Sequence, residues 1–236
     1  MDRTRLSGAL VALYELVARL RGPGGCPWDA RQTPHTVKMY LLEECYEVLD
    51  ALERDRPRQV CQELGDLLFQ VLFLAYMGEE KGEFDLLETL EGIHEKMVRR
   101  HPHVFGREKA DSPEEVARNW ARIKEDERSD VEDPGSLLRS VPAGLPALLR
   151  AHRLSERASK ASETVEEEPD PWAGTQADFK ALEGALAQKD TVRSGEILGR
   201  LLFDLASLAR SLGFNAEDLL RKANQAFVEG FRARET

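Results

Sequence analysis

The sequence predicts an all-α protein, and three observations support this prediction. Apolar residues recur at spacings of three and four over most of the chain, which is the period of amphipathic helices. The sequence has no convincing run of alternating β-branched residues bounded by turn residues. Glycine and proline stand near the ends of several periodic segments, where they end or begin helices.

The first three predicted helices follow one another closely. The first covers residues 4–21 and ends at the glycine- and proline-rich residues 22–25, which open the loop GCPWDARQTP. The second covers residues 36–54 and stops before Pro57, because proline cannot continue the helix that precedes it. The third covers residues 57–78 and is the most apolar segment of the chain.

Two more helices complete the first half of the chain. The fourth runs from near Phe84 to Pro102. The fifth runs from Pro113 to about Arg128, because Ser112 is a favourable N-cap and Pro113 is favourable at the first helical position. Acidic residues in its first turn add a favourable interaction with the helix dipole.

The second half of the chain repeats features of the first. The sequence GDLLF at residues 65–69 returns as GRLLF at residues 199–203, and Pro27-Trp28 has an echo in Pro171-Trp172. Residues 131–146 are rich in Asp, Pro, Gly and Ser, which is typical of a linker. We therefore predict two tandem units, residues 1–130 and 147–236, joined by a linker over residues 131–146.

Composition excludes several classes of protein. The 236 residues are 42% hydrophobic and 32% charged, which is typical of globular proteins that fold without disulfides. A formal charge of −10 argues against general binding to nucleic acid polymers or anionic lipids. Three cysteines without a CxxC pair fit free thiols in the cytoplasm. The longest uncharged apolar run, residues 67–78, is shorter than the ~20 residues that span a bilayer, so no membrane segment is expected.

Acidic residues lie beside the apolar stripe of the second predicted helix. At 100° per residue, Glu43, Glu44 and Glu47 fall in one sector of that helix about 100° wide. Taken alone, this pattern fits the solvated acidic edge of an ordinary surface helix equally well.

The third predicted helix favours a metal site. It is apolar at nearly every angle and is therefore expected to be buried, yet Glu63 and Asp66 share one face of it with Gln70. An isolated buried carboxylate costs several kcal/mol or more, so a bound divalent cation is the simplest compensation. Two short-spaced acidic pairs on consecutive antiparallel helices would meet at one centre, and these pairs are Glu44 with Glu47 and Glu63 with Asp66. A set of carboxylate oxygens selects Mg²⁺, with Mn²⁺ as a substitute.

Three segments carry a family resemblance. The runs GCPWDARQTPHTVKMYLLEECYEVLDALE, QELGDLLFQVLF and RRHPHVFG resemble the MazG-type nucleoside triphosphate pyrophosphohydrolases over about residues 5–128. This resemblance implies a MazG-like four-helix core that binds Mg²⁺ through the four acidic residues. It also implies cleavage of ribo- and deoxyribonucleoside triphosphates between the α- and β-phosphates, in the manner of a house-cleaning enzyme that works as a homodimer or a higher homo-oligomer.

The enzymatic interpretation gives other residues candidate roles. Glu43, beside the metal ligands, is the candidate for positioning or deprotonating the attacking water. Basic side chains are expected to receive the triphosphate, and these are Lys38, Lys96, Arg99 and Arg100. Trp28 is a candidate for stacking on the base. Simpler alternatives remain open, because cations in the last turns of a helix favour its dipole and a tryptophan in a loop often packs against the core.

The second unit departs from the family pattern. Ile197 stands in the place of Glu63 and Arg200 in that of Asp66, while Glu183 alone remains near the first acidic pair. We therefore predict a degenerate repeat that holds no metal and that stabilises or dimerises the first unit.

Two rival classes of protein compete with the pyrophosphohydrolase interpretation. A di-iron helical bundle needs Glu-x-x-His on two helices, and only Glu91 with His94 fits that pattern. The alternative from another class is a non-catalytic helical protein that binds nucleotide or regulates a partner.

Overall fold

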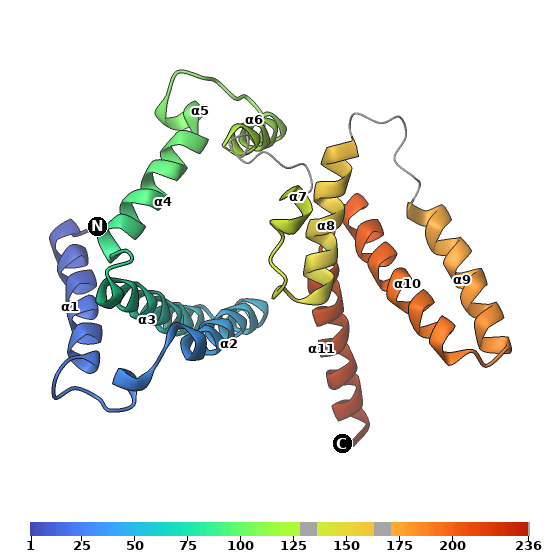
Figure 1. The fold of residues 1–236 in the computed structure, drawn as a ribbon, viewed down its shortest axis with the longest axis horizontal. Helices are drawn as coiled ribbons and strands as arrows, with labels where there is room; N and C mark the ends of the chain where they lie inside the picture. Colours follow the sequence, from blue (N-terminus) through green and yellow to red (C-terminus); the bar gives the residue numbers. More distant parts are fainter. Residues whose placement is uncertain (128–135, 163–170, 236) are drawn as a thin grey trace. The chain divides into compact units, whose positions relative to one another are not determined.

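The computed structural model describes residues 1–127, 136–162 and 171–235. Within these ranges every regular element is a helix, which confirms the predicted fold class (Figure 1). The chain divides into two compact units, Met1–Glu127 and Arg128–Thr236. The first part of the predicted linker, residues 131–135, lies outside the described residues, and a short helix, α7 (Ser136–Arg139), lies in the part that is described.

The five predicted helices of unit 1 begin and end within three residues of their predicted bounds. The elements of this unit are α1 (Arg3–Arg21), the short 3₁₀ helix η1 (Asp29–Arg31), α2 (Pro34–Glu53), α3 (Pro57–Lys81), α4 (Leu86–Arg100), α5 (Pro102–Phe105) and α6 (Pro113–Asp126). The prediction missed η1 and α5. The short helix α5 begins at Pro102, which has no amide hydrogen to continue α4, so α4 ends at Arg100.

Capping boxes fix where α2 and α4 begin. The Thr33 amide donates to Thr36 Oγ1 at 2.9 Å, and the Thr36 amide donates back to Thr33 Oγ1 at 3.3 Å. Asp85 and Glu88 form the same reciprocal pair at α4, with distances of 2.7 and 3.0 Å. A capping box satisfies two amides that a helix would otherwise leave without partners. These caps therefore set the register of the two helices that carry most of the candidate site residues.

The core of unit 1 lies where α1, α2 and α3 meet. Its buried side chains are Val17, Val37, Leu72, Phe73 and Met77. Val17 comes from α1 and Val37 from α2, whereas the other three belong to the second half of α3. This half of α3 is thus anchored in the core.

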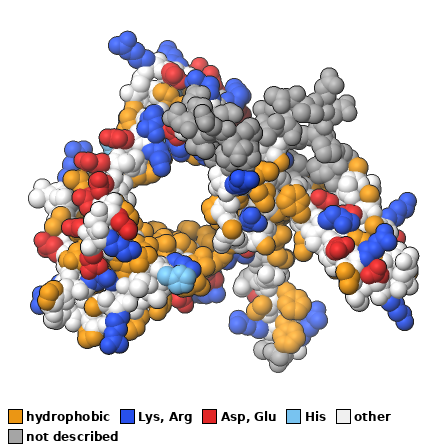
Figure 2. All heavy atoms as spheres, in the orientation of Figure 1, with side chains coloured by type: hydrophobic (Ala, Val, Ile, Leu, Met, Phe, Trp, Pro, Cys, Tyr) orange, Lys and Arg blue, Asp and Glu red, His pale blue; other side chains and the backbone are white. Residues whose placement is uncertain are grey.

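The expectation that α3 is buried on all sides is wrong for the single chain. Leu64, Leu68 and Val71 lie along one face of α3 and are 50%, 41% and 41% exposed. Within the chain α3 packs on α1, α2 and α4, and these helices leave that face uncovered. Figure 2 shows hydrophobic side chains gathered along α2 and α3.

Among the described residues, α3 is the one helix long and apolar enough to cross a membrane. In its most apolar stretch of eighteen residues, 28% of the residues are buried inside the protein. However, α3 supplies three residues of the unit 1 core. A helix packed in the core of a globular protein passes the same test of length and composition.

In its described residues, unit 2 contains α7 and four longer helices. These are α8 (Ala147–Ser162), α9 (Pro171–Ala187), α10 (Thr191–Ser211) and α11 (Ala216–Glu235). The helix α10 packs on both α8 and α9, and α11 packs on α8. One small core joins α9 to α10 through Ala185, Ile197 and Leu201, and a second, rich in alanine, joins α8, α10 and α11.

The hairpin α2–α3 of unit 1 and the hairpin α9–α10 of unit 2 have the same turn. Asp55 has φ 50° and Lys189 has φ 55°, and among the described residues other than glycine these two alone have positive φ. In both turns this residue's amide donates to the carbonyl three residues before it, and the next amide donates to the carbonyl of a buried alanine, Ala51 or Ala185. Asp55 and Lys189 are thus equivalent positions.

Candidate metal centre

Three carboxylates from α2 and α3 meet in unit 1. One oxygen each of Glu44, Glu63 and Asp66 lies within 4.8 Å of the other two. Glu44 precedes Asp55 by eleven residues and Asp66 follows it by eleven, so the antiparallel hairpin brings the two to the same level. The hairpin geometry therefore explains why these sequence positions converge.

The carboxylate of Glu63 is the most deeply placed of the three. Glu63 is 8% exposed, and Gln59 Nε2 donates to its Oε1 at 3.5 Å. Across the described ranges, no Lys or Arg forms an ion pair with Glu44, Glu63 or Asp66. Like charges this close destabilise each other unless a cation compensates them. The donors are all carboxylate oxygens, which fits a divalent cation that prefers hard ligands.

Glu47 lies at the edge of this centre. Glu47 and Glu63 stand eight residues before and after Asp55, so they also share a level of the hairpin, but Glu47 is exposed and lies outside the tight group of three. Partial desolvation of its carboxyl beside α3, followed by the charges of Glu63 and Glu43, raises the pKa of Glu47. Burial, followed by the charges of Glu47 and Asp66, raises that of Glu44.

Glu43 is exposed on α2, next to Glu44 in sequence. Its negative charge raises the pKa of both Glu44 and Glu47, which places its carboxylate in the same electrostatic field. Glu43 is not among the three residues whose oxygens meet within 4.8 Å.

Arg21 fastens the loop that carries Trp28. Its guanidinium donates to Glu80 Oε2 at 2.6 and 2.9 Å and to the Asp29 carbonyl at 2.7 Å, and it lies over the ring of Phe73. Trp28 is 56% exposed, and its ring centroid is 5.8 Å from that of Tyr40, one turn before Glu44 on α2. The loop thus holds an accessible aromatic face beside α2.

Two of the basic candidates of α4, Arg99 and Arg100, share an acidic partner that the sequence did not predict. Glu127 accepts hydrogen bonds from Arg99 Nε at 2.8 Å and from Arg100 Nε at 3.1 Å. These hydrogen bonds, first that of Arg100 and then that of Arg99, lower the pKa of Glu127 to about 2. No sequence signal links Glu127 to α4, because the packing of α6 beside α4 brings them together.

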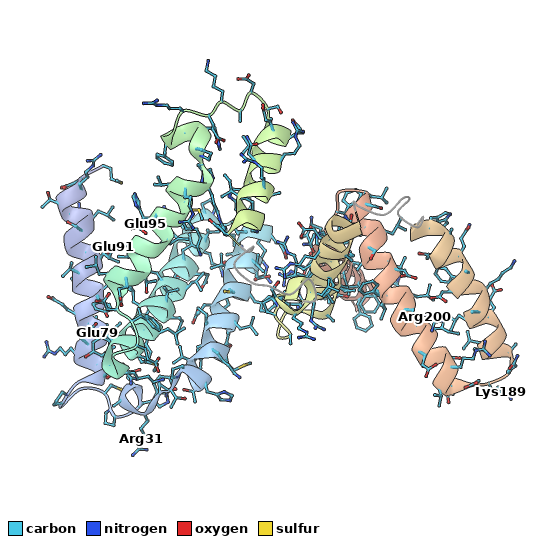
Figure 3. All side chains as sticks on the ribbon, turned by 45° about the horizontal axis from the view of Figure 1, so that its top comes forward. Arg31, Glu79, Glu91, Glu95, Lys189 and Arg200 are labelled. Atoms are coloured by element: carbon cyan, nitrogen blue, oxygen red, sulfur yellow. The ribbon has the colours of Figure 1, made fainter. Side chains whose placement is uncertain are left out.

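Two other predicted phosphate ligands, Lys38 on α2 and Lys96 on α4, have exposed side chains. The di-iron alternative gains no support from the structure. Figure 3 shows Glu91 and Glu95 on α4, and His94 lies with them on one exposed face of that helix. The group of three convergent ligands contains no histidine. One Glu-x-x-His pair on one helix does not form a bridged di-iron site.

These features define the class of protein: in its described residues it is all-helical, with a convergent acidic cluster between two antiparallel helices that could hold a metal ion. The family profile of the MazG nucleotide pyrophosphohydrolase domain matches residues 32–105, which include α2, α3 and α4. Over 231 residues the chain is 41% identical to the nucleoside triphosphate pyrophosphohydrolase of Escherichia coli K12, covering 93% of this chain and 84% of that protein. Over 223 residues it is 36% identical to the nucleoside triphosphate pyrophosphohydrolase/pyrophosphatase MazG of Thermotoga maritima, covering 94% and 84%. The chain belongs to the MazG nucleotide pyrophosphohydrolase family.

Proposed function

We propose that this chain hydrolyses nucleoside triphosphates between the α- and β-phosphates and releases a nucleoside monophosphate and pyrophosphate. Family membership supports the reaction class, because both relatives described above are named for it. The observation that carries the proposal is the convergence of Glu44, Glu63 and Asp66 within 4.8 Å, with no basic partner among the described residues.

We propose Mg²⁺ as the cofactor, with Mn²⁺ as a substitute, held by Glu44, Glu47, Glu63 and Asp66. Carboxylate oxygens match both ions, and Mg²⁺ commonly keeps positions open for water and substrate phosphates. Once bound, the cation would neutralise charge on the phosphates and lower the pKa of a coordinated water. The four acidic residues fix its position because they come from two helices joined by a short turn.

Glu43 is the proposed residue for positioning or deprotonating the attacking water. It adjoins Glu44 and is exposed, so solvent reaches its carboxylate directly. A carboxylate is a weak base at neutral pH, and its contribution would therefore come mostly from holding the water in line with the phosphorus atom.

The substrate is proposed to lie between the loop of Trp28 and the basic side chains of unit 1. The exposed ring of Trp28 offers a stacking surface for a base of either a ribo- or a deoxyribonucleotide. Lys38, Lys96, Arg99 and Arg100 are the proposed phosphate ligands. The two arginines already hold one carboxylate, that of Glu127, so a phosphate would have to replace it.

We propose a cytoplasmic homodimer or higher homo-oligomer. The support is the exposed apolar face of α3, because Leu64, Leu68 and Val71 form a stripe that a second copy of this chain would bury. We further propose that residues 1–130 form the catalytic domain, that residues 131–146 link it to the second unit, and that residues 147–236 are a degenerate repeat without catalytic activity.

The test is hydrolysis by the purified chain with Mg²⁺ and each of the common ribo- and deoxyribonucleoside triphosphates. We expect monophosphate and pyrophosphate in equal amounts, measured by ion-exchange chromatography. Asp66→Asn and Glu47→Gln should each lower kcat at least ~100-fold, a loss of about 2.7 kcal/mol of transition-state stabilisation. Glu53→Gln, at the end of α2, is the matched control for Glu47→Gln and should retain turnover.

Two outcomes would contradict the proposal. Release of diphosphate and orthophosphate would show that a different bond is cleaved. Saturable nucleotide binding without any product would favour the alternative function, that of a non-catalytic nucleotide-binding or regulatory protein.

A further inference from the structure

The shared turn aligns the two hairpins residue by residue. Asp178 precedes Lys189 by eleven residues and Arg200 follows it by eleven, as Glu44 and Asp66 do around Asp55. By the same count Ala181 stands in the place of Glu47 and Ile197 in that of Glu63. This alignment corrects two sequence-based correspondences. Asp178, rather than Glu183, occupies the place of an acidic ligand, and Pro171 corresponds to Val37 rather than to Pro27.

The two residues of unit 2 that are equivalent to Glu44 and Asp66 form an ion pair. Arg200 Nε donates to Asp178 Oδ2 at 3.1 Å, and Arg200 Nη2 donates to Asp178 Oδ1 at 3.0 Å. Such paired parallel hydrogen bonds are the strongest arrangement of guanidinium and carboxylate. The Asp178 side chain is 18% exposed, and Arg200 extends from α10 (Figure 3).

More acidic residues surround this guanidinium. Glu196 and Asp204 stand one turn before and after Arg200 on α10, and the three line one open hollow with Gly199 and Phe203. Burial, and then the charge of Asp178, raises the pKa of the Asp204 carboxyl. The positive charge of Arg200 therefore compensates three nearby carboxylates. Among the described residues, no Lys or Arg forms an ion pair with the convergent carboxylates of unit 1.

The position and the chemistry of this ion pair together indicate that the arginine replaces a bound cation. An ordinary surface ion pair contributes about 0–1 kcal/mol and needs no particular position. Asp178 and Arg200, however, stand at the positions that are equivalent to Glu44 and Asp66 of unit 1. The remaining two ligand positions carry apolar residues, and Ile197 belongs to the core that joins α9 and α10, with 2% of its surface exposed.

We propose that the guanidinium of Arg200 takes, in unit 2, the place that a divalent cation takes in unit 1. Unit 2 then carries its own cation, binds no divalent ion between α9 and α10, and keeps this hairpin folded at any Mg²⁺ concentration. This inference rests on the proposed function in one respect, because it assumes that the unit 1 carboxylates bind a cation.

The experiment counts Mn²⁺ ions bound to the full chain by electron paramagnetic resonance and records melting temperatures with and without Mn²⁺. It starts from Glu63→Gln/Asp66→Asn, which removes two of the three convergent carboxylates of unit 1. With native Arg200 this double variant should bind no Mn²⁺. Adding Arg200→Asp should create a site for about one ion per chain and make the melting temperature of unit 2 rise on addition of Mn²⁺.

Two further variants serve as controls. Arg193→Asp, on the same helix, makes the same change of charge away from Asp178 and should gain neither the ion nor the Mn²⁺-dependent rise. If Arg200→Asp does not fold, Arg200→Gln removes the cation without adding a charge. It should lower the melting temperature of unit 2, and Mn²⁺ should restore part of that loss.

The outcomes separate the inference from the proposed function. The inference would be overturned if the double variant with native Arg200 still bound Mn²⁺. It would also be overturned if the Arg200 variants gained no ion and their melting temperature did not depend on Mn²⁺. If the unaltered chain and the double variant bind the same amount of Mn²⁺, the proposed metal site of unit 1 is contradicted instead.

Discussion

Glu63 carries the most deeply buried carboxylate of the candidate site in unit 1. Its side chain is nearly buried, and two further carboxylate oxygens lie within 4.8 Å of it. The hydrogen bond from Gln59 is long and does not neutralise its charge. Without a bound cation, the repulsion among these groups opposes folding of the α2–α3 hairpin.

Replacing Glu63 by glutamine should therefore separate stability from function. In EDTA, Glu63→Gln should raise the melting temperature by a few degrees, because one buried negative charge is removed. The rise in melting temperature on addition of Mg²⁺ should shrink, and turnover should fall at least ~100-fold. Scanning calorimetry with and without Mg²⁺ measures the first two effects. The same change at Glu15, which is exposed on α1, should alter none of these quantities, and a Glu63→Gln protein less stable than the unaltered chain in EDTA would argue against repulsion at this centre.

Glu127 is an ion-pair partner of Arg99 and Arg100 that lies far from them in the sequence. Its carboxylate binds Arg99 and Arg100, and this lowers its pKa from an ordinary 4.5 to about 2. Because the folded-state pKa is the lower one, the contact stabilises the protein fully above pH 4.5 and loses this effect as the pH falls toward 2.

Glu127→Gln should show this pH dependence. At pH 7 the variant should be less stable than the unaltered chain, and the difference should vanish as the pH approaches 2. Chemical unfolding at several pH values measures it. If the two arginines also bind the triphosphate, the variant should have a lower KM at pH 7, because phosphate no longer competes with a carboxylate. An unchanged KM would assign the arginines a purely structural role.

At the scale of elements, the α2–α3 hairpin converts sequence spacing into a site. Its short turn with Asp55 at positive φ sets the register of the two helices, and the N-terminal cap of α2 fixes where that helix begins. A helix periodicity alone places Glu44 and Glu47 on one face of α2. Only the turn decides that Glu63 and Asp66 lie opposite them.

The exposed stripe on α3 carries a prediction about assembly. Leu68→Glu should convert an oligomer of this chain to monomers, because a charge replaces an apolar side chain on a face that a second copy would bury. Light scattering coupled to size-exclusion chromatography measures the mass. Leu6→Glu is the control, because Leu6 is exposed on α1, and it should leave the mass unchanged. A monomeric unaltered chain would exclude the proposed homo-oligomer.

At the scale of the whole molecule, the chain divides into two units with different chemistry at equivalent places. The family profile covers residues 32–105 and therefore lies within unit 1, whereas the similarity to the Escherichia coli protein covers 93% of the chain. In unit 1 the hairpin brings carboxylates together, and in unit 2 the equivalent hairpin brings an arginine to an aspartate.

Truncation after Asp130 tests this division. The shortened chain should keep Mg²⁺ binding and pyrophosphate release, since every proposed ligand belongs to unit 1. Its oligomeric state and melting temperature report what unit 2 adds. Loss of turnover by a shortened chain that keeps its helical circular dichroism would show that unit 2 contributes directly to catalysis.

The sequence by itself determined the helical fold, most helix bounds and three acidic residues whose carboxylates converge between α2 and α3, Glu44, Glu63 and Asp66. These depend on local signals, because helical periodicity, caps and proline act over a few residues. It did not reveal Glu127 or Asp178 as ion-pair partners, or the uncovered face of α3.

Only the tertiary structure decided these features. Arg100 and Glu127 are 27 residues apart, and Asp178 and Arg200 are 22 residues apart, so helix packing alone brings each pair into contact. Likewise, the apolar pattern of α3 shows that its residues avoid water, but which of its faces the same chain covers depends on where the neighbouring helices pack.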